Sequence, residues 1–204
     1  MALVQLWTGD HRGAIASYQQ ALPLLRTVGS KFDEADALCG LGAARRLTGD
    51  YVGAMTDERQ SLDLFRSLGD RLGQAWALDE LGLVQQQTGD YPAAAASVTE
   101  AIELLRDLGS RRDLAMALNS LGELSLRTSS AEEARRHHGQ ALTIAREIGA
   151  PLEAAHALEG IGRSFLGQDR AEAGAHLRQA LEIYTGIGVP DARRVRDTLD
   201  GHDF

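Results

Sequence analysis

The stretch LTGDYVGAMTDERQSLDLFRSLGD at residues 47–70 returns 40 positions later as QTGDYPAAAASVTEAIELLRDLGS at residues 87–110. Its tripeptide Thr-Gly-Asp also occurs 40 positions earlier, at residues 8–10. A fixed period of this length is typical of solenoids, in which one supersecondary unit is stacked on the next. The sequence therefore predicts a linear stack of similar units instead of a single globular core.

The same period continues through the rest of the chain, with a last step of 39 residues. An alanine, an aliphatic residue and a glycine recur in every copy: Ala14, Ala54, Ala94, Ala134 and Ala173; Leu22, Leu62, Ile102, Leu142 and Leu181; and Gly29, Gly69, Gly109, Gly149 and Gly188. In the copy 30–69, the apolar residues before Gly49 have helical spacing. Gly49 is expected to close this helix in the left-handed conformation, and Asp50 to cap the next one. Each copy thus predicts an antiparallel helical hairpin.

Four glycines lie in the middle of the first predicted helix of their copies, where each costs about 1 kcal/mol relative to alanine. They are Gly42, Gly82, Gly122 and Gly162. A costly residue repeated at one position needs a steric reason. We expect the alanine that recurs in the second helix of each copy to press against the glycine of the first helix. These alanines are Ala54, Ala94, Ala134 and Ala173.

Three local features qualify this pattern. Pro23 lies inside a predicted second helix, which it should kink or make irregular. Ser130 followed by Glu133, and Asp169 followed by Glu172, predict capping boxes where the turn sequence has drifted. The last helix, 191–200, carries arginines where the other copies have apolar residues, so we expect it to be a solvent-facing cap.

The overall charge and composition exclude several classes of function. A net charge of −8 argues against a nucleic-acid surface, which needs clustered lysine and arginine. No stretch has the run of about 18 apolar residues that spans a bilayer, and no signal peptide is recognisable, so we expect a cytoplasmic protein. The single Cys39 is expected to be a buried or half-buried, unreactive thiol.

Nothing in the sequence predicts catalysis, a metal or a cofactor. His137 and His138 are adjacent, so on a helix they point about 100° apart and cannot share a metal ion. The other histidines have no cysteine or histidine at ligand spacing. No nucleophile has a base placed beside it by a nearby motif.

The repeat unit resembles the tetratricopeptide repeat. Leu38, Leu41-Gly42, Ala54 and Ser61 match one copy of that pattern, and equivalent residues match the next three copies. The unit here is longer than the usual 34 residues, and is similar to the C-terminal repeats of actinobacterial transcriptional regulators and to spindle-orientation adaptors. The resemblance implies an all-α, right-handed superhelical α-solenoid of antiparallel hairpins. A single domain, 1–204, would comprise a partial repeat 1–29, repeats 30–69, 70–109, 110–149 and 150–188, and a capping helix 189–204.

The resemblance also implies a binding surface, because in that family the first helix of each hairpin lines the concave face. The positions that it assigns to this groove are Asp36, Arg46, Trp76, Asp79, Met116, Asn119, Glu123, His156, Glu159 and Arg163. We expect them to bind a peptide or helix, with the acidic residues favouring a basic or amide-rich segment. The alternative is that these side chains only fill the space between helices. The expected role is a scaffold or sensor module of a larger cytoplasmic regulatory protein.

A second hypothesis is self-association. Only half of the first predicted helix, Met1 to Trp7, is present, so Leu3, Leu6 and Trp7 are expected to lack a neighbour. Either the natural protein continues upstream or this end pairs with another chain, which would make a homo-oligomer.

Overall fold

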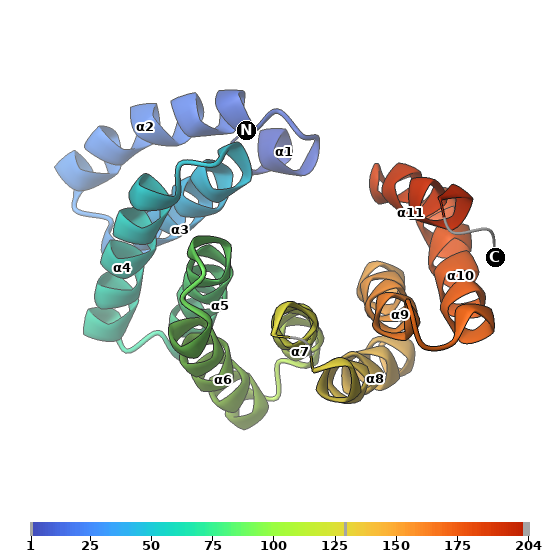
Figure 1. Ribbon diagram of the computed structural model, residues 1–204. Coiled ribbons are helices and arrows are strands. Elements are labelled where there is room, and N and C mark those ends of the chain that lie inside the picture. Colours follow the sequence, from blue (N-terminus) through green and yellow to red (C-terminus); the bar gives the residue numbers. More distant parts are fainter. Residues whose placement is uncertain (1, 129, 202–204) are drawn as a thin grey trace. The chain divides into compact units, whose positions relative to one another are not determined.

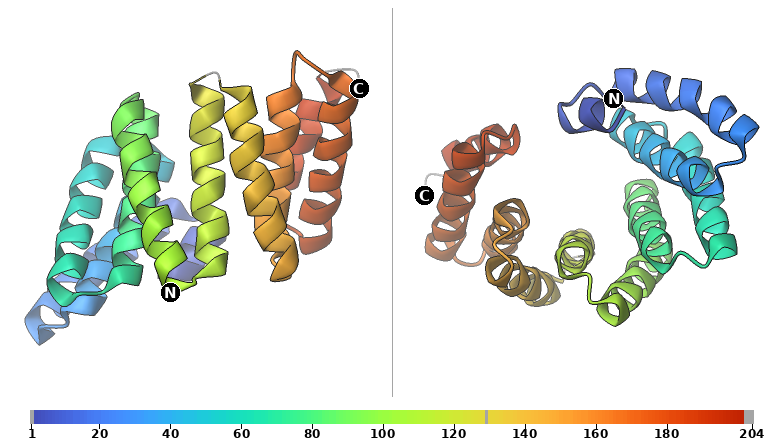
Figure 2. Two further views of the ribbon diagram at one scale, coloured as in Figure 1. Left: turned by 90° about the horizontal axis from the view of Figure 1, so that it is seen from below. Right: turned by 180° about the vertical axis from the view of Figure 1, so that it is seen from behind.

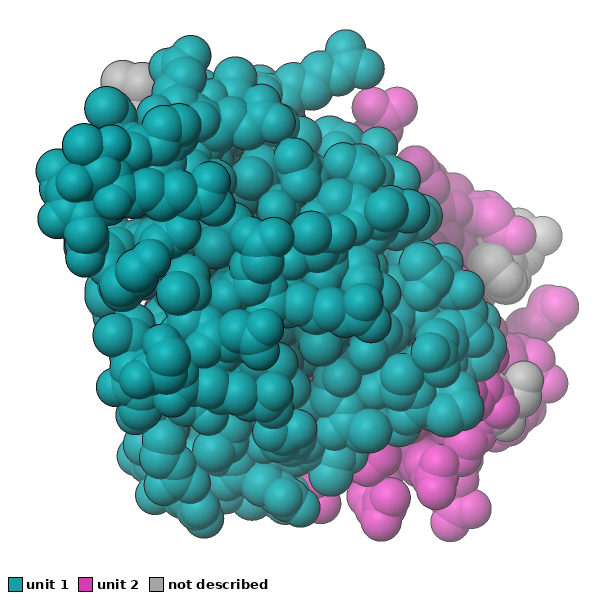
Figure 3. All heavy atoms as spheres, turned by 90° about the vertical axis from the view of Figure 1, so that its left-hand side faces the viewer, with its two compact units in different colours: residues 1–108 teal, residues 109–204 magenta. Residues whose placement is uncertain are grey.

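The computed structural model describes residues 2–128 and 130–201, and within these ranges the chain consists of helices joined by short turns (Figure 1). The helices are α1 (Ala2–Trp7), α2 (His11–Val28), α3 (Lys31–Thr48), α4 (Tyr51–Leu68), α5 (Arg71–Thr88), α6 (Tyr91–Leu108), α7 (Arg111–Arg127), α8 (Ala131–Glu147), α9 (Pro151–Phe165), α10 (Arg170–Ile187) and α11 (Asp191–Asp200). They form two compact units, residues 1–108 and residues 109–204, which Figure 3 colours separately.

In unit 1, residues 1–108, each helix packs against the next one along the chain, from α1 to α6. The first helices of two successive hairpins, α3 and α5, also contact each other. This is the expected all-α stack of antiparallel hairpins, in which a helix buries its apolar stripe against its own partner and against the following hairpin (Figure 2).

Unit 2, residues 109–204, repeats the arrangement. The first helices α7 and α9 lie side by side, while α8 packs against both of them, α10 packs against α9, and α11 packs against α10. The interior combines alanines with a few large side chains, among them Leu118, Leu158, Leu177 and Tyr184, each at most 2% exposed. Alanine lets the helix backbones approach closely, and the larger residues fill the remaining space.

The turns form as the sequence predicts. Gly49 follows α3 with a φ of 85°, and its amide and that of Asp50 donate to the carbonyls of Arg46 and Arg45 at 3.1 and 3.0 Å. The Asp50 carboxylate then accepts from the Gly53 amide at 3.0 Å, which caps α4. The turn tripeptide therefore ends one helix and begins the next through local bonds.

The structure bears on three local expectations. α2 includes the exposed Pro23 and continues as one helix to Val28, so the proline does not end the helix, and the kink expected there stays a prediction. The capping box expected at Ser130 does not form on the serine side, because this hydroxyl makes no bond to the first turn of α8. The expected cap at Asp169 is confirmed, since its carboxylate accepts from the Glu172 amide at 3.1 Å.

The mid-helix glycines face a different residue from the one predicted. A Cβ on each of the four would meet the side chain four residues after the expected alanine: Glu58 at Gly42, Val98 at Gly82, His138 at Gly122 and Leu177 at Gly162. The alanines contribute only a backbone carbonyl, 3.3 Å from the Gly82 position for Ala94 and 3.1 Å from the Gly162 position for Ala173. The steric explanation is therefore confirmed, but the contacting residue was wrong. We call the site of Glu58, Val98, His138 and Leu177, together with Tyr18 of the first copy, the packing position.

The N-terminal helix has a neighbour within its own unit. Leu6 of α1 is partly buried against the cluster that contains Tyr18 and Leu22 of α2. The side chains of Leu3 and Trp7, which were expected to lack a neighbour, lie outside the described residues.

Candidate functional site

Helices α7, α8, α9 and α11 of unit 2 surround a cavity of about 280 Å³. It is lined by Asn119, Glu123, His138, His156, Glu159, Gly160, Arg163 and Arg194. Five of these residues, Asn119, Glu123, His156, Glu159 and Arg163, were predicted for the binding face. They converge because residues three or four apart share one side of a helix, and α7 and α9 lie next to each other.

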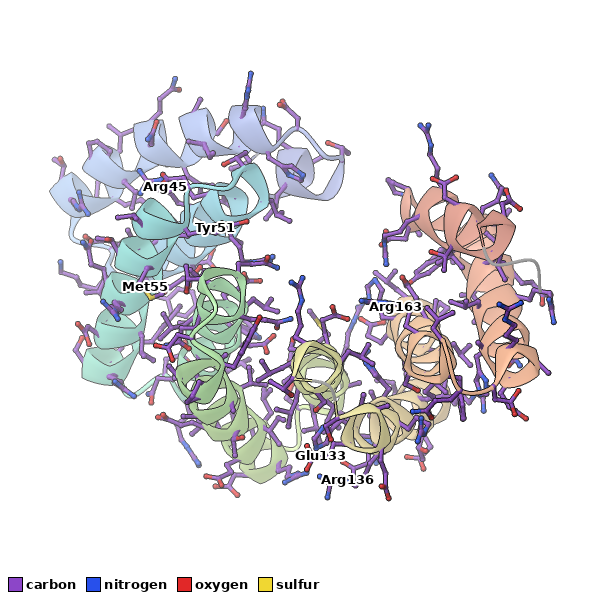
Figure 4. The ribbon with its side chains drawn as sticks, viewed as in Figure 1. Arg45, Tyr51, Met55, Glu133, Arg136 and Arg163 are labelled. Atoms are coloured by element: carbon purple, nitrogen blue, oxygen red, sulfur yellow. The ribbon has the colours of Figure 1, made fainter. Side chains whose placement is uncertain are left out.

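Two ion pairs cross this cavity between helices. Arg163 of α9 donates from both Nη atoms to the Glu123 carboxylate of α7, at 2.6 and 3.2 Å. Glu159 of α9 pairs with Arg194 of α11 and also accepts from the buried Tyr184 hydroxyl at 3.0 Å. In Figure 4, Arg163 lies on α9, whereas Arg136 lies on the outer side of α8. The ion pairs thus hold α7, α9 and α11 in place around the cavity.

Asn119 of α7 forms a hydrogen-bonded relay that connects α9 with α8. Asn119 donates from Nδ2 to the Glu153 carbonyl at 3.1 Å, and its Oδ1 lies 3.0 Å from Nδ1 of His138. His138 is 2% exposed, and its ring fits between Gly122 of α7 and Gly160 of α9, where any Cβ would collide with it. The two glycines therefore make room for an imidazole that reaches the cavity from α8.

Both histidines of the cavity are held neutral. Burial, with the nearby positive charge of Arg163, lowers the pKa of His138 to about 3. Burial also lowers the pKa of His156, whose ring packs on Tyr184 with 5.6 Å between centroids. With neutral imidazoles, the two carboxylates and two guanidinium groups of the lining balance each other.

Sequence reasoning missed His138, Gly160 and Arg194. The signal for His138 was present, because the packing position holds Val98 and Leu177 in other copies, and a histidine there places a polar group in the interior. Arg194 was assigned to a solvent-facing helix; its side chain is half exposed, but its guanidinium binds Glu159. That contact depends on how α11 packs, which no local pattern reports.

The remaining predicted residues lie elsewhere. Met116 of α7 is 47% exposed and is not part of the cavity lining. In unit 1, Asp36 is exposed on α3, while Trp76 and Asp79 are half buried on α5. Arg46 of α3 binds Glu80 of α5, with 3.0 Å between Nε and Oε2. This pair joins the first helices of two hairpins, as Arg163 and Glu123 do in unit 2.

Unit 1 has its own buried polar residue at the packing position. Glu58 is fully buried, and neither carboxyl oxygen has a hydrogen-bond partner among the described residues. Burial, followed by the charge of Glu80, raises the pKa of Glu58 well above its usual value, although the Cys39 thiol and the charge of Arg46 act in the opposite direction. Burial likewise raises the pKa of the half-buried Cys39, which disfavours the reactive thiolate form.

Over residues 2–128 and 130–201, no group of three or more His, Cys, Asp or Glu side chains is arranged to hold a metal ion. Within the same ranges, every helix is too short or too polar to cross a membrane.

Comparison with known proteins agrees with this architecture. The sequence profile described as tetratricopeptide repeat matches residues 113–186, which lie within unit 2 and include seven of the eight lining residues. No curated protein matches the chain.

Solved structures show the same fold at low sequence identity. A Rap protein complexed with Competence and Sporulation Factor has a TM-score of 0.84 and 14% identity, over 99% of this chain and 62% of that one. The Rap conjugation gene regulator of plasmid pLS20, in complex with the Phr* peptide, has a TM-score of 0.88 and 14% identity, over 98% and 56%. A signal transduction ATPase with a tetratricopeptide repeat sensor from Pyrococcus horikoshii has a TM-score of 0.76 and 16% identity, over 97% and 30%. This chain therefore spans less than two thirds of each, and the similarity defines a helical-repeat fold of the tetratricopeptide type.

Proposed function

We propose that this chain is a protein-interaction module that binds a peptide or helical segment of a partner, with the cavity of unit 2 as an anchoring site. The observation that carries the proposal is the convergence of Asn119, Glu123, His156, Glu159 and Arg163 on one cavity. Concave sites with a few fixed polar groups are the usual form of a ligand pocket. The surrounding ion pairs orient these groups before a ligand arrives, which lowers the entropic cost of binding.

The similar structures support a peptide ligand. One Rap structure is complexed with Competence and Sporulation Factor and the other with the Phr* peptide. The sensor in the Pyrococcus horikoshii protein supports the finer proposal that this chain is the sensing or scaffolding part of a larger cytoplasmic regulator. We further propose that the module is not an enzyme and needs no cofactor. Its net charge of −8 supports a protein partner over nucleic acid.

The test begins with peptides selected from a random display library by the wild-type chain, with affinities measured by fluorescence anisotropy. Arg163→Ala should weaken the selected peptide at least about 10-fold, because it removes a charged group at the centre of the site. Arg136→Ala is the matched control, since Arg136 lies on the outer side of α8; its affinity should stay within about 2-fold, as expected for a residue outside an interface. Enrichment of no peptide, or equal effects of the two variants, would contradict the proposal.

The remaining binding-face residues of unit 1 need a separate measurement. Trp76 is large and half buried on α5, which is the type of side chain that contributes strongly to interfaces. If unit 1 takes part in binding, Trp76→Ala should weaken the selected peptide while the circular dichroism spectrum stays helical. An unchanged affinity would restrict the binding site to unit 2.

Self-association is the second candidate, favoured by apolar side chains that α1 and α2 leave exposed. Val4, Leu24 and Val28 are 57%, 68% and 74% exposed. Sedimentation velocity over a concentration series tests this directly, and Leu24→Glu with Val28→Glu should shift any dimer to monomer. A protein that is monomeric at all concentrations would contradict self-association, and this result would not bear on the proposed peptide binding.

A further inference from the structure

The chemistry of the cavity can be read from the protonation of His138. Its neighbour Asn119 uses Nδ2 to donate to the Glu153 carbonyl at 3.1 Å, which fixes the orientation of the amide. Oδ1 of Asn119 therefore faces Nδ1 of His138 at 3.0 Å, and an amide oxygen can only accept. The proton of the neutral ring must then lie on Nδ1. It follows that Nε2 carries a lone pair and can only accept.

This acceptor has no partner in the part of the chain that the structure describes. Nε2 of His138 is buried without a hydrogen bond, and the side chain lines the cavity. The backbone of Gly160, which also lines the cavity, lies so close that a Cβ there would collide with Nε2. A buried acceptor that stays unpaired destabilises the folded state. The packing position accommodates leucine in another copy, so the fold does not require a polar group here.

The charged groups of the lining are paired. Arg163 binds both oxygens of Glu123, and Glu159 binds Arg194 and the Tyr184 hydroxyl. Because these charges balance, a charged ligand would bring an unmatched charge or have to break an ion pair. The two guanidinium groups nevertheless have five N–H donors each, more than the carboxylates take up. The cavity thus offers one neutral acceptor beside spare donors.

We propose that the cavity of unit 2 binds an uncharged carboxamide, the side chain of an asparagine or glutamine in the peptide, with its N–H donating to Nε2 of His138. The carboxamide oxygen accepts from the guanidinium groups of Arg163 or Arg194. A carboxylate has no proton for Nε2, and an ammonium group would remain without a counter-charge. This inference deepens the proposed function and rests on it for the identification of the ligand as part of a peptide.

Nuclear magnetic resonance of the full chain with ¹⁵N-labelled histidine tests the proposal without any substitution. The free protein should show His138 as the neutral Nδ1–H tautomer at pH 7. Propionamide should shift its Nε2 resonance in a saturable way and shift Nδ1 less. Methyl propionate, which has the carbonyl but no donor, should bind at least about 10-fold more weakly, the loss expected for one hydrogen bond to a buried group.

Propionate and propylammonium complete the probe series. Neither should shift Nε2 at concentrations where propionamide saturates. An Nε2–H tautomer, a charged ring, or a stronger response to either ion than to propionamide would overturn the proposal.

The second test replaces His138 by the residue that occupies the packing position in another copy of the repeat. His138→Leu places at the packing position the residue that Leu177 provides in the next copy, so it should fold while lacking the acceptor. Propionamide should then shift the Gly160 backbone amide at least about 10-fold more weakly than in the wild type. His176→Leu is the control, because His176 lies outside the cavity lining and its Nδ1 contacts the Glu172 carbonyl of its own helix. Equal propionamide affinity in His138→Leu and the wild type would contradict the proposal, and the probe series on the wild type decides it even if His138→Leu does not fold.

The two proposals fail in different ways. If a selected peptide binds and is lost in Arg163→Ala, but exchange of its glutamine or asparagine for glutamate or aspartate changes nothing, the peptide function stands and the carboxamide inference is wrong. If propionamide shifts His138 as described but no peptide is ever selected, the chemistry of the cavity stands and the peptide function is wrong.

Discussion

Five side chains of this protein occupy the packing position, yet they differ in chemistry. They are Tyr18, Glu58, Val98, His138 and Leu177. All are at most 8% exposed, so each lies in the interior between neighbouring helices. Valine and leucine suffice for packing, whereas glutamate and histidine bring a desolvation cost that packing does not explain. A polar residue at the packing position therefore lowers the stability of the fold. In unit 2 this residue is His138, which lines the cavity.

The packing of the mid-helix glycines predicts opposite effects of two alanine substitutions. Gly82→Ala should destabilise the fold by about 1–3 kcal/mol, because its Cβ would overlap Val98, which is 2% exposed and cannot move aside. Gly139→Ala should stabilise it by up to about 1 kcal/mol, because that helical position has no atom within 4 Å of the new methyl group. Urea denaturation of the two variants measures both free energies, and effects of the same sign would contradict the packing described here.

Glu58 predicts a pH-dependent gain in stability on substitution. Its pKa in the folded protein lies well above the usual 4.5. Glu58 therefore stays protonated to a higher pH in the folded protein than in the unfolded chain. As the pH rises above about 4.5, the free energy of unfolding of the wild type falls. Glu58→Leu should remove this loss and raise the free energy of unfolding by about 1–4 kcal/mol at pH 7, as found when buried charged groups are replaced by apolar ones.

The matched control for this prediction is Glu103→Leu, because Glu103 is exposed on α6. Its effect should stay within about 0.5 kcal/mol at every pH. Urea denaturation between pH 5 and pH 8 compares the two variants. A difference between Glu58→Leu and the wild type that does not grow with pH would show that Glu58 is not held protonated.

At the scale of the helices, the cap residues divide by chemistry. Aspartates accept from the first turn of the helix that they begin, as at Asp10, Asp50 and Asp169. Ser30 and Ser110 instead donate to Asp33 and Asp113, three residues later. A hydroxyl has a proton that a carboxylate lacks. In these two caps the serine hydroxyl donates that proton to the acidic side chain of the first turn. Ser30 and Ser110 begin first helices, where the equivalent Asp70 accepts from the Leu72 amide at 3.2 Å, so this position of the repeat begins a helix in two different ways.

This division predicts unequal costs for removing a cap. Asp50→Ala should lower the free energy of unfolding by about 1 kcal/mol, because it leaves the Gly53 amide without its side-chain acceptor. Ser130→Ala should change it by less than about 0.5 kcal/mol, since the Ser130 side chain makes no cap hydrogen bond. Thermal denaturation followed by circular dichroism compares the two variants; an equal loss at Ser130 would mean that its hydroxyl does cap α8.

At the scale of the whole molecule, the chain divides into units that each bury their own core. The eight residues of the cavity lining all belong to unit 2. The ion pairs and the relay that position them also lie within residues 109–204. Stacked hairpins draw their stability from nearest-neighbour contacts, so a unit of this size can retain its local structure.

We therefore expect the fragment 109–204 to fold by itself and to keep the cavity. It should give a helical circular dichroism spectrum, unfold cooperatively and show the same neutral tautomer of His138 as the full chain. Fragment 1–108 is the comparison, since it should be helical but show no response to propionamide. An unfolded 109–204 fragment would show that contacts outside unit 2 are needed for its stability.

The sequence by itself determined the features that depend on local chemistry. The left-handed glycines and the aspartate caps act within a few residues, so the end of α3 and the start of α4 follow from the stretch around Thr48-Gly49-Asp50. The resemblance to the tetratricopeptide repeat then picked out five residues of α7 and α9 that line the cavity.

Only the tertiary structure decided which side chains from different helices meet. The residue that faces each mid-helix glycine was predicted one helical turn too early, because the offset of a helix along its axis is set by the helices packed against it. Arg194 lines the cavity because α11 packs against α10, a contact between helices that the local sequence does not report. The free lone pair of His138 follows from two hydrogen bonds that cross between α7, α8 and α9. Such contacts join residues 19 and 34 positions apart, beyond the reach of any local pattern.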